Sequence, residues 1–291
     1  MIIRVILRLY RLTEIGMDFF TEHESTIRLS VFIGVLAVMA FLEAVFPRRQ
    51  RVQKRSARWT TNLGLIVIDT IALRLALPIV AMGMAVIAET RGWGLLNQVS
   101  WPLWVELIIA IAVLDMLIYW QHVASHHIPL LWRLHKVHHA DRDIDVTTGI
   151  RFHPIEIILS MVYKIVCIVL LGPAVAAVFL FEVILNACAM FNHANVRLPL
   201  WLDQFIRVFL VTPDMHRVHH STIVKETNSN YGFSLSIWDR LFGSYIAQPR
   251  EGHDGMTIGL AEYQDKGPSS LLWTLIIPFR RKLSNNSNKE R

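Results

Sequence analysis

Cysteine and charge are both scarce in this chain. Only two cysteines occur among 291 residues, Cys167 and Cys188, and both lie inside apolar segments. This argues against a disulfide framework and against an iron–sulfur or thiolate zinc site. Charged residues make up only 18% of the chain and hydrophobic residues 53%, which indicates a membrane protein. The net charge of +6 comes from basic residues beside apolar runs, so we expect anionic lipid headgroups, and no nucleic acid, as partners.

Several catalytic signatures are also missing. The HExxH motif of zinc metalloproteases is absent, since Val123 follows His122. No Glu-x-x-His pair of the kind used by soluble di-iron carboxylate proteins occurs. The sequence shows neither a GxGxxG fingerprint after a strand nor a separate haem domain. Any electrons that the protein uses must therefore come from an external electron-donor protein.

Histidine is the residue that is concentrated. Of 13 histidines, 11 fall between residues 122 and 220, where an even scatter would place about four. They form HVASHH at 122–127, HKVHH at 135–139 and HRVHH at 216–220. In HxxHH, positions i, i+3 and i+4 share one helix face, so three imidazoles are expected to converge on one locus. Neutral imidazole suits iron, zinc and copper, and eight such ligands, too many for one ion, predict a dinuclear metal site: His122, His126, His135, His138, His139, His216, His219 and His220.

The apolar segments define a membrane topology. The loop 48–58 carries six basic residues and no acidic one, which places it in the cytoplasm by the positive-inside rule. With that loop inside, every histidine cluster falls on the cytoplasmic face. The sequence predicts an all-α integral membrane protein with a cytosolic, histidine-rich helical cap. It has about four to five transmembrane or hairpin helices, in the apolar segments 29–46, 63–88, 102–120, 155–171 and 174–191.

The histidine motifs and their surroundings resemble a known family. DMLIYWQHVASH at 115–126, LWRLHKVHH at 131–139, NHAN at 192–195 and HRVHHS at 216–221 are similar to the membrane fatty acid hydroxylase and sterol desaturase superfamily. NYGFSLSIWDRLFGS at 230–244 resembles the segment that follows the last cluster in that family. The resemblance implies an all-helical membrane enzyme that holds two iron ions through histidines. It also implies the use of O2 and two electrons to hydroxylate or desaturate a lipid.

The resemblance and the apolar segments together predict four parts in the chain. Residues 105–245 form a fatty acid hydroxylase-like catalytic domain, preceded by transmembrane helices at 29–104. Residues 1–28 form an N-terminal amphipathic segment, with Arg4, Arg8 and Arg11 at helical spacing among apolar residues. Residues 246–291 form a C-terminal tail, in which 271–279 is expected to be an interfacial helix.

Carried over residue by residue, the resemblance makes the eight clustered histidines metal ligands and adds His193 of NHAN as a ninth. His153 of RFHP is a ligand or a partner of one. His127, His23 and His253 match no ligand position.

Ligating histidines need partners for their second ring nitrogens. Asp115 lies seven residues before His122, and therefore on the same helix face. Asp214 precedes His216, and Asn195 flanks His193, so these three polar residues are candidate partners, with helix capping as the competing interpretation. Within the apolar segment 174–191, an intramembrane carboxylate at Glu182 suggests function, whereas an ion pair with Lys164 is the favoured alternative.

The function predicted from these residues is that of a membrane-bound non-haem di-iron oxidoreductase. It would use O2 and two electrons to hydroxylate a C–H bond of a membrane lipid. Desaturation is the alternative within the family, because both reactions begin by removing a hydrogen atom. A membrane metal-binding or transport protein is the alternative from another class, and a haem-anchoring protein is a third. Sterols, fatty acyl chains, ether lipids, carotenoids and sphingolipids are all handled within the superfamily.

Overall fold

A computed structural model describes residues 23–100, 102–265 and 267–280, and it confirms the all-α prediction. Within these ranges no strand occurs, and β-type pairing is confined to isolated bridges such as Pro47 with Val196. Residues 1–22 of the amphipathic segment expected over 1–28 lie outside the described residues, and a long helix begins within that segment at Glu24. The five candidate membrane spans match the predicted four to five, and the chain is an integral membrane protein.

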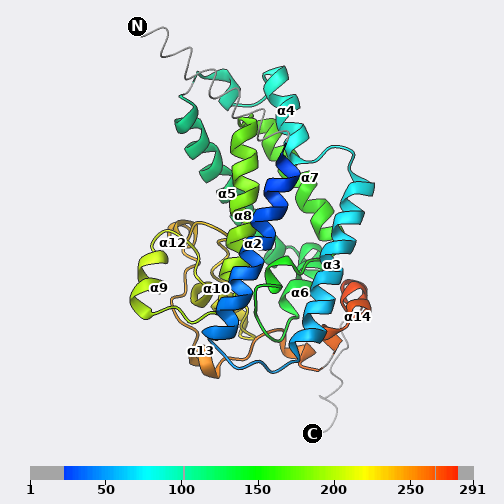
Figure 1. Ribbon diagram of the computed structural model, residues 1–291, viewed down its shortest axis with the longest axis vertical. Helices are drawn as coiled ribbons and strands as arrows, with labels where there is room; N and C mark the ends of the chain where they lie inside the picture. The colour runs from blue at the N-terminus through cyan, green and yellow to red at the C-terminus, as the bar shows by residue number, and fades with distance from the viewer. Residues whose placement is uncertain (1–22, 101, 266, 281–291) are drawn as a thin grey trace.

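Six helices form the bundle that runs vertically in Figure 1. The span Arg55–Gln98 contains two of them, separated by residues 77–80. Pro78 lies in this break, where it removes a backbone donor and ends the regular helix. The predicted hairpin at Gly172-Pro173 is also present. The bundle comprises α2 (Glu24–Val45), α3 (Arg55–Ala76), α4 (Ala81–Arg91), α5 (Leu103–His127), α7 (Pro154–Leu171) and α8 (Val175–Asn192).

The turn between α7 and α8 depends on two glycines. Gly172 ends α7 with a φ of +63°, a left-handed conformation that favours glycine. A Cβ built on Gly94 would lie 2.1 Å from the backbone nitrogen of Gly172. Only glycine therefore fits at residue 94, and this contact fixes the loop after α4 against the α7–α8 turn.

The helix directions bring the polar ends of the bundle together. The C-terminal ends of α2, α5 and α8 and the N-terminal ends of α3 and α7 all lie toward the lower end of Figure 1. Short helices form a cap there, and all the histidine clusters lie at this end. The cap contains α6 (Pro129–His139), α9 (Leu200–Ile206), α10 (Pro213–His219), α11 (Val224–Thr227), α12 (Ile237–Leu241), α13 (Gly252–Gly255) and α14 (Leu271–Ile276).

Glu182 forms an ion-pair cluster inside the bundle, and this cluster includes the predicted pair with Lys164. Its Oε1 lies 2.7 Å from Lys164 Nζ, and its Oε2 lies 2.8 Å from Arg28 Nη2. Two cations therefore hold this intramembrane carboxylate between α2, α7 and α8. The cluster offsets the cost of placing a carboxylate among apolar helices, and Glu182 belongs to neither histidine group.

A second polar network joins α3 to the cap. Arg58 is completely buried and donates to both carboxylate oxygens of Asp141, at 2.7 and 2.8 Å, and to Asp145 Oδ2 at 2.5 Å. Arg151, also fully buried, donates to Asn62 of α3 and to the carbonyl of Pro268. This network fixes the loop 140–153 that follows α6. The C-terminal segment with α14 closes over it, where Thr274 Oγ1 accepts from Arg151.

Candidate metal centre

Nine histidines converge where the bundle meets the cap. Helix α5 presents His122 and His126 in its last turns, and α8 is followed directly by His193. The remaining six lie on α6 and on or just after α10. The histidines form two adjacent groups, within each of which one nitrogen per residue lies within 4.8 Å of the others. The first group is His122, His126, His135, His139 and His219, and the second is His138, His193, His216 and His220.

Each HxxHH motif serves both groups, which corrects the expectation that its three imidazoles share one locus. On α6, the i and i+4 residues His135 and His139 enter the first group, whereas the i+3 residue His138 enters the second. The motif at α10 does the reverse, giving His219 to the first group and the other two to the second. The i+3 and i+4 side chains lie on opposite sides of residue i around the helix. A helix that lies between the two groups therefore presents one imidazole to one side and two to the other.

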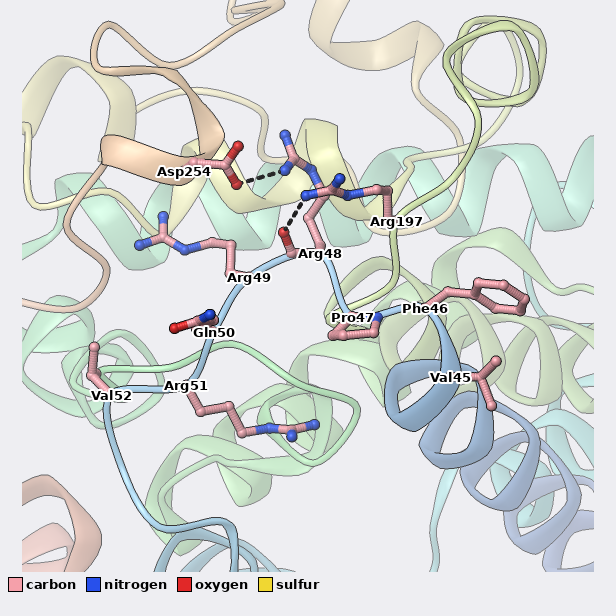
Figure 2. Close-up of a pocket in the computed structure, with 10 residues that line it drawn as sticks. All are labelled: Val45, Phe46, Pro47, Arg48, Arg49, Gln50, Arg51, Val52, Arg197 and Asp254. Carbon is pink, nitrogen blue, oxygen red and sulfur yellow. Dashed lines mark hydrogen bonds and ion pairs between the residues drawn. The ribbon is translucent and has the colours of Figure 1, made fainter.

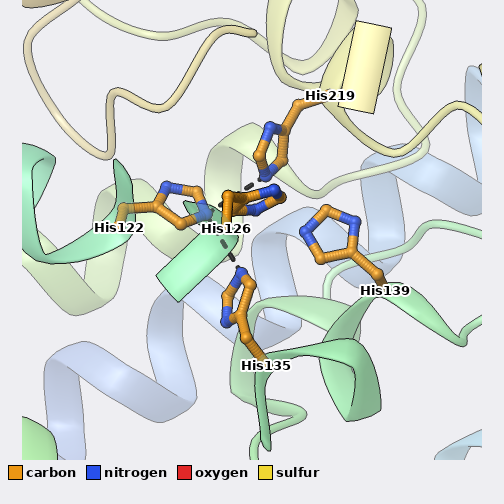
Figure 3. Close-up of side chains that lie close together, drawn as sticks. All are labelled: His122, His126, His135, His139 and His219. Atoms are coloured by element: carbon orange, nitrogen blue, oxygen red, sulfur yellow. Dashed lines mark hydrogen bonds between the residues drawn. The ribbon is translucent and has the colours of Figure 1, made fainter. Parts of the chain in front are cut away.

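The first group has its inner nitrogens close together, as Figure 3 shows. The Nε2 atoms of His135 and His219 each lie 3.1 Å from His122 Nε2. The outer nitrogens face acceptors: His122 Nδ1 lies 2.7 Å from the carbonyl of Tyr231, and His219 Nδ1 lies 2.6 Å from that of Ser229. These outer contacts orient the rings with their Nε2 atoms toward the centre.

The carboxylate of Glu156 serves the same purpose for His135, whose Nδ1 lies 2.6 Å from Glu156 Oε1. His126 Nδ1 lies 3.2 Å from Asn228 Oδ1, and its Nε2 has no partner among the described residues. Glu156 comes from the first turn of α7. A carboxylate behind a ligating imidazole fixes the tautomer and makes the inner nitrogen more basic.

The second group is built in the same way. His193 Nε2 lies 3.0 Å from the Nε2 atoms of both His138 and His216. His193 Nδ1 lies 2.6 Å from the carbonyl of Ala189, and His138 Nδ1 lies 3.2 Å from that of Arg151. The buried arginine network described above thereby holds the carbonyl that orients His138.

The inner nitrogens fit a metal ion better than they fit one another. Where Nδ1 carries the proton donated to a carbonyl, Nε2 of the neutral ring has only a lone pair. The Nε2 atoms of His122 and His219 are both of this kind, so their 3.1 Å contact brings two lone pairs together. Two nitrogens bound at about 2.1 Å to one ion, at right angles, would lie about 3.0 Å apart. A cation at the centre of each group resolves this repulsion.

Burial favours the neutral, ligating form of most of these imidazoles. It holds the pKa of His138, His139, His216 and His220 well below the ordinary range, and neighbouring histidines lower it further. Burial also lowers the pKa of His193 to about 4 and that of His219 to about 3. His139 and His220 are almost fully buried, and neither ring nitrogen of either residue has a partner among the described residues. Such orphaned nitrogens in the interior are costly unless a bound group satisfies them.

The three polar residues expected to orient the histidines have other partners. Asp115 Oδ2 accepts from the backbone of Leu235 and from Trp238 Nε1, so it fixes the 230–244 segment to α5. Asn195 exchanges hydrogen bonds with the backbone of Arg49. Asp214 pairs with Arg48 and Arg217, and none of these three acidic or amide side chains bonds to a histidine of either group. Spacing along the sequence placed them close to the ligands, but their side chains point to neighbouring segments.

The remaining histidines lie outside both groups. His153 caps the N-terminus of α7 by accepting from Ile155, and its Nε2 lies 3.2 Å from the carbonyl of Leu275. His127 is exposed and contacts the hydroxyl of Tyr231. His253 lies 3.6 Å from Asp214. The structure therefore separates these residues from the nine that converge.

Most of the atoms that orient the rings could not be found from the sequence. Four of them are backbone carbonyls, which any residue type can supply: those of Tyr231, Ser229, Ala189 and Arg151. Glu156 is a side chain, but it lies 21 residues from His135 on another helix. No spacing rule connects the two.

A basic pocket of about 950 Å³ lies where the end of α2 and the segment after it meet Arg197 and Asp254. Figure 2 shows Arg48, Arg49, Arg51 and Arg197 around it, with Asp254 as the one acidic residue of its lining. The pocket is connected to the histidines through one short segment. The backbone nitrogen of Arg48 donates to the carbonyl of Asn195 at 3.0 Å, and Asn195 follows His193 by two residues.

Residues 107–244, which contain all nine histidines, match the family model described as fatty acid hydroxylase. This part of the chain belongs to the fatty acid hydroxylase family. The resemblance inferred from the histidine motifs is thereby confirmed.

Three curated relatives illustrate the range of the family. Ornithine lipid hydroxylase OlsE of Rhizobium tropici is 26% identical over 264 residues, covering 87% of this chain and 75% of that protein. Human alkylglycerol monooxygenase is 30% identical over 140 residues, 48% of this chain and 30% of that protein. Mouse lathosterol oxidase is 31% identical and covers 49% of this chain and 46% of that protein. The chain thus spans most of the first relative and less than half of the other two. No solved structure matches it.

Proposed function

We propose that this protein is a membrane-bound di-iron oxidoreductase that hydroxylates a C–H bond of a lipid. The observation that carries the proposal is the convergence of nine imidazoles into two adjacent groups. Two bound iron ions would supply the activation of O2. In the overall reaction a C–H bond becomes C–OH, while one O2, two electrons and two protons yield one water. The imidazoles of both groups would hold the ions, and Glu156 would orient His135.

The lipid substrate class rests on the relatives and on the position of the site. The relatives are named for an ornithine lipid, alkylglycerols and lathosterol. His122 and His126 close α5, a candidate membrane span, so a lipid chain can reach the first group between helices. Dehydrogenation is the second candidate, favoured by the relative named as an oxidase. Transport is not favoured, because transporters place their sites along a path near the midplane, whereas these groups lie at one end of the bundle.

The orientation proposed for the protein places the metal centre in the cytoplasm. The basic segment 48–58 lies at the same end of the bundle as the nine histidines. The positive-inside rule assigns this segment to the cytoplasm, and the helix directions then assign the histidines to the same side. An external electron-donor protein would approach this face.

The basic pocket is the surface on which we expect that donor to dock. Its lining holds four arginines and one aspartate, and it connects through Asn195 to His193. Arg48 and Arg51 also pair with Asp214 and Glu43, and Arg197 is exposed. Complementary charge raises the association rate of such transient partners. The partner predicted by this charge is an acidic redox protein.

The proposal is tested by elemental analysis and lipid mass spectrometry. Purified protein, reconstituted with iron without oxygen, should hold close to two irons per chain, with no haem absorption and no labile sulfide. Cells that express the gene should contain a lipid that is heavier by one oxygen, which is absent when the gene is deleted. A lipid that loses two hydrogens instead would establish dehydrogenation. One iron or none after reconstitution would contradict the di-iron assignment.

A further inference from the structure

One cavity adjoins the first histidine group, and a second cavity shares part of its lining. The inner cavity, about 140 Å³, lies between α5, α7 and α8 and is lined by His122 and His135. The outer cavity, about 270 Å³, lies between α5, α6 and α7. Trp120 and Leu159 line the outer cavity and are 44% and 43% exposed on the outside of the bundle. The outer cavity therefore lies between the lipid-facing surface and the inner cavity.

The residues shared by the two cavities are all polar. Four residues line both: Gln121, Ser125, Glu156 and Ser160. The residues that line only the outer cavity are apolar or aromatic: Trp120, Ala124, Leu131, Leu134, Leu159 and Tyr163. We call the four shared residues the collar. These residues of α5 and α7 lie between the two cavities, so a lipid that reaches the histidines from the outer cavity would pass beside them.

Within the collar, one strong acceptor is unused. Glu156 Oε1 is occupied by His135 Nδ1 at 2.6 Å, but the buried Oε2 has no partner among the described residues. Ser160 Oγ and Ser125 Oγ are both engaged with Gln121, at its side-chain oxygen and its backbone carbonyl respectively. The collar thus offers a carboxylate oxygen without a donor. A buried acceptor of this kind is unfavourable unless a ligand or water satisfies it.

We propose that the collar selects lipids that carry a hydroxyl or amide N–H donor close to the carbon that is oxidised. The donor bonds to Glu156 Oε2 while the apolar chain occupies the outer cavity. The same carboxylate holds His135 through its other oxygen, so the bonded donor fixes the neighbouring carbons beside the first histidine group. Glu156 is in this sense a positioning and specificity-determining residue. The statement about the oxidised carbon rests on the proposed function. The preference for binding a donor does not.

Two matched probe pairs test the donor requirement by binding alone. N-methylhexadecanamide and N,N-dimethylhexadecanamide differ by one N–H, and hexadecanol and its methyl ether differ by one O–H. Binding is measured on iron-loaded protein in nanodiscs under nitrogen, where no oxidation occurs. The wild-type protein should bind the donor member of each pair at least about tenfold more tightly, as expected for a hydrogen bond to a charged acceptor.

Glu156→Gln sharpens the test, because the substituted amide can keep the bond to His135 through its oxygen. It then presents an N–H group to the cavities, where the wild type presents an acceptor. The preference for donor probes should be lost. Because Glu156 also orients His135, wild type and variant are compared at equal iron loading, measured for each preparation. Glu106→Gln is the matched control. Glu106 lies in the first turn of α5, far along that helix from the collar, and accepts from the backbone of Ala174. This control should keep the wild-type preference. All proteins are compared in the same nanodiscs, so the partition of each probe into the bilayer is the same for each protein and cancels.

The outcomes separate this inference from the proposed function. Equal binding of both probes in each pair by the wild type would overturn the collar assignment, and so would a preference that Glu156→Gln leaves unchanged. If Glu156→Gln does not fold, the wild-type comparison alone decides. Absence of any oxidised lipid would contradict the proposed function, yet a donor preference would still be measurable.

Discussion

Replacing Arg58 by methionine should destabilise the protein far more than the same change at a neighbouring arginine. Arg58 is completely buried and donates five hydrogen bonds, to Asp141, Asp145, the carbonyl of Asp143 and Thr148. Arg58→Met would leave Asp141 and Asp145, which are 1% and 0% exposed, without their main counter-charge. Breaking a buried ion pair from one side costs about 3–5 kcal/mol.

The matched control is Arg55→Met, one turn earlier on the same helix. The Arg55 side chain is 33% exposed, stacks over Trp59 and lies 3.8 Å from Glu43. Glu43 itself is buried, but it also has Arg51 at 3.5 Å and accepts from the backbone of Val146 and Asn195, so the loss of the partly exposed Arg55 should cost about 1 kcal/mol or less. The free energy of unfolding is measured by denaturant titration in mixed micelles at neutral pH. Equal losses for the two variants, or no loss for Arg58→Met, would refute the assignment of Arg58 as the support of the 140–153 loop.

The same variant should change the response to acid. Burial alone would raise the pKa of Asp141, but the charge of Arg58 outweighs it and lowers this pKa to about 2. A carboxylate whose folded-state pKa lies below the unfolded value of about 3.9 stabilises the fold above that value and loses this contribution as pH falls toward 2. Wild-type stability should therefore fall between about pH 4 and pH 2. In Arg58→Met the part of this fall that belongs to Asp141 should be missing.

Three further predictions concern the ligands, the topology and the electron donor. His139→Ala should lose iron and activity together, by at least the factor of about 10–100 seen when partners of metal ligands are removed. Exposed His127→Ala should stay within a few-fold of the wild type, and the reverse result would contradict the grouping. Cysteines introduced at exposed Ser56 and Lys225 should resist an impermeant thiol reagent in intact cells, while one at exposed Gln98 should react. Labelling of Lys225→Cys from outside would contradict the cytoplasmic position of the cap. Arg197→Glu should slow reduction by an acidic donor and flatten its salt dependence without changing iron content, since Arg197 is exposed at the basic pocket; an unchanged rate would move the docking surface elsewhere.

The sequence alone determined the membrane class, the helix-rich architecture and the residue type of the candidate centre. Those features depend on local composition and spacing: long apolar runs must form helices in a bilayer, because every backbone group has to be satisfied within the segment. The Gly172-Pro173 break and the Glu182–Lys164 pair were predictable for the same reason, since each follows from one or two helices.

The tertiary structure alone decided how the ligands are shared and what holds them. An HxxHH motif fixes which histidines share a helix face. The position of the helix between the two groups then decides which group each histidine joins. Thus His138 lies apart from His135 and His139, although all three lie within one helical turn and a half. Glu156 lies behind His135, and Asp115 binds Trp238 instead of a histidine, because these contacts join segments far apart in the chain. Contacts of this kind arise only when the helices pack, and no pattern within a single segment contains them.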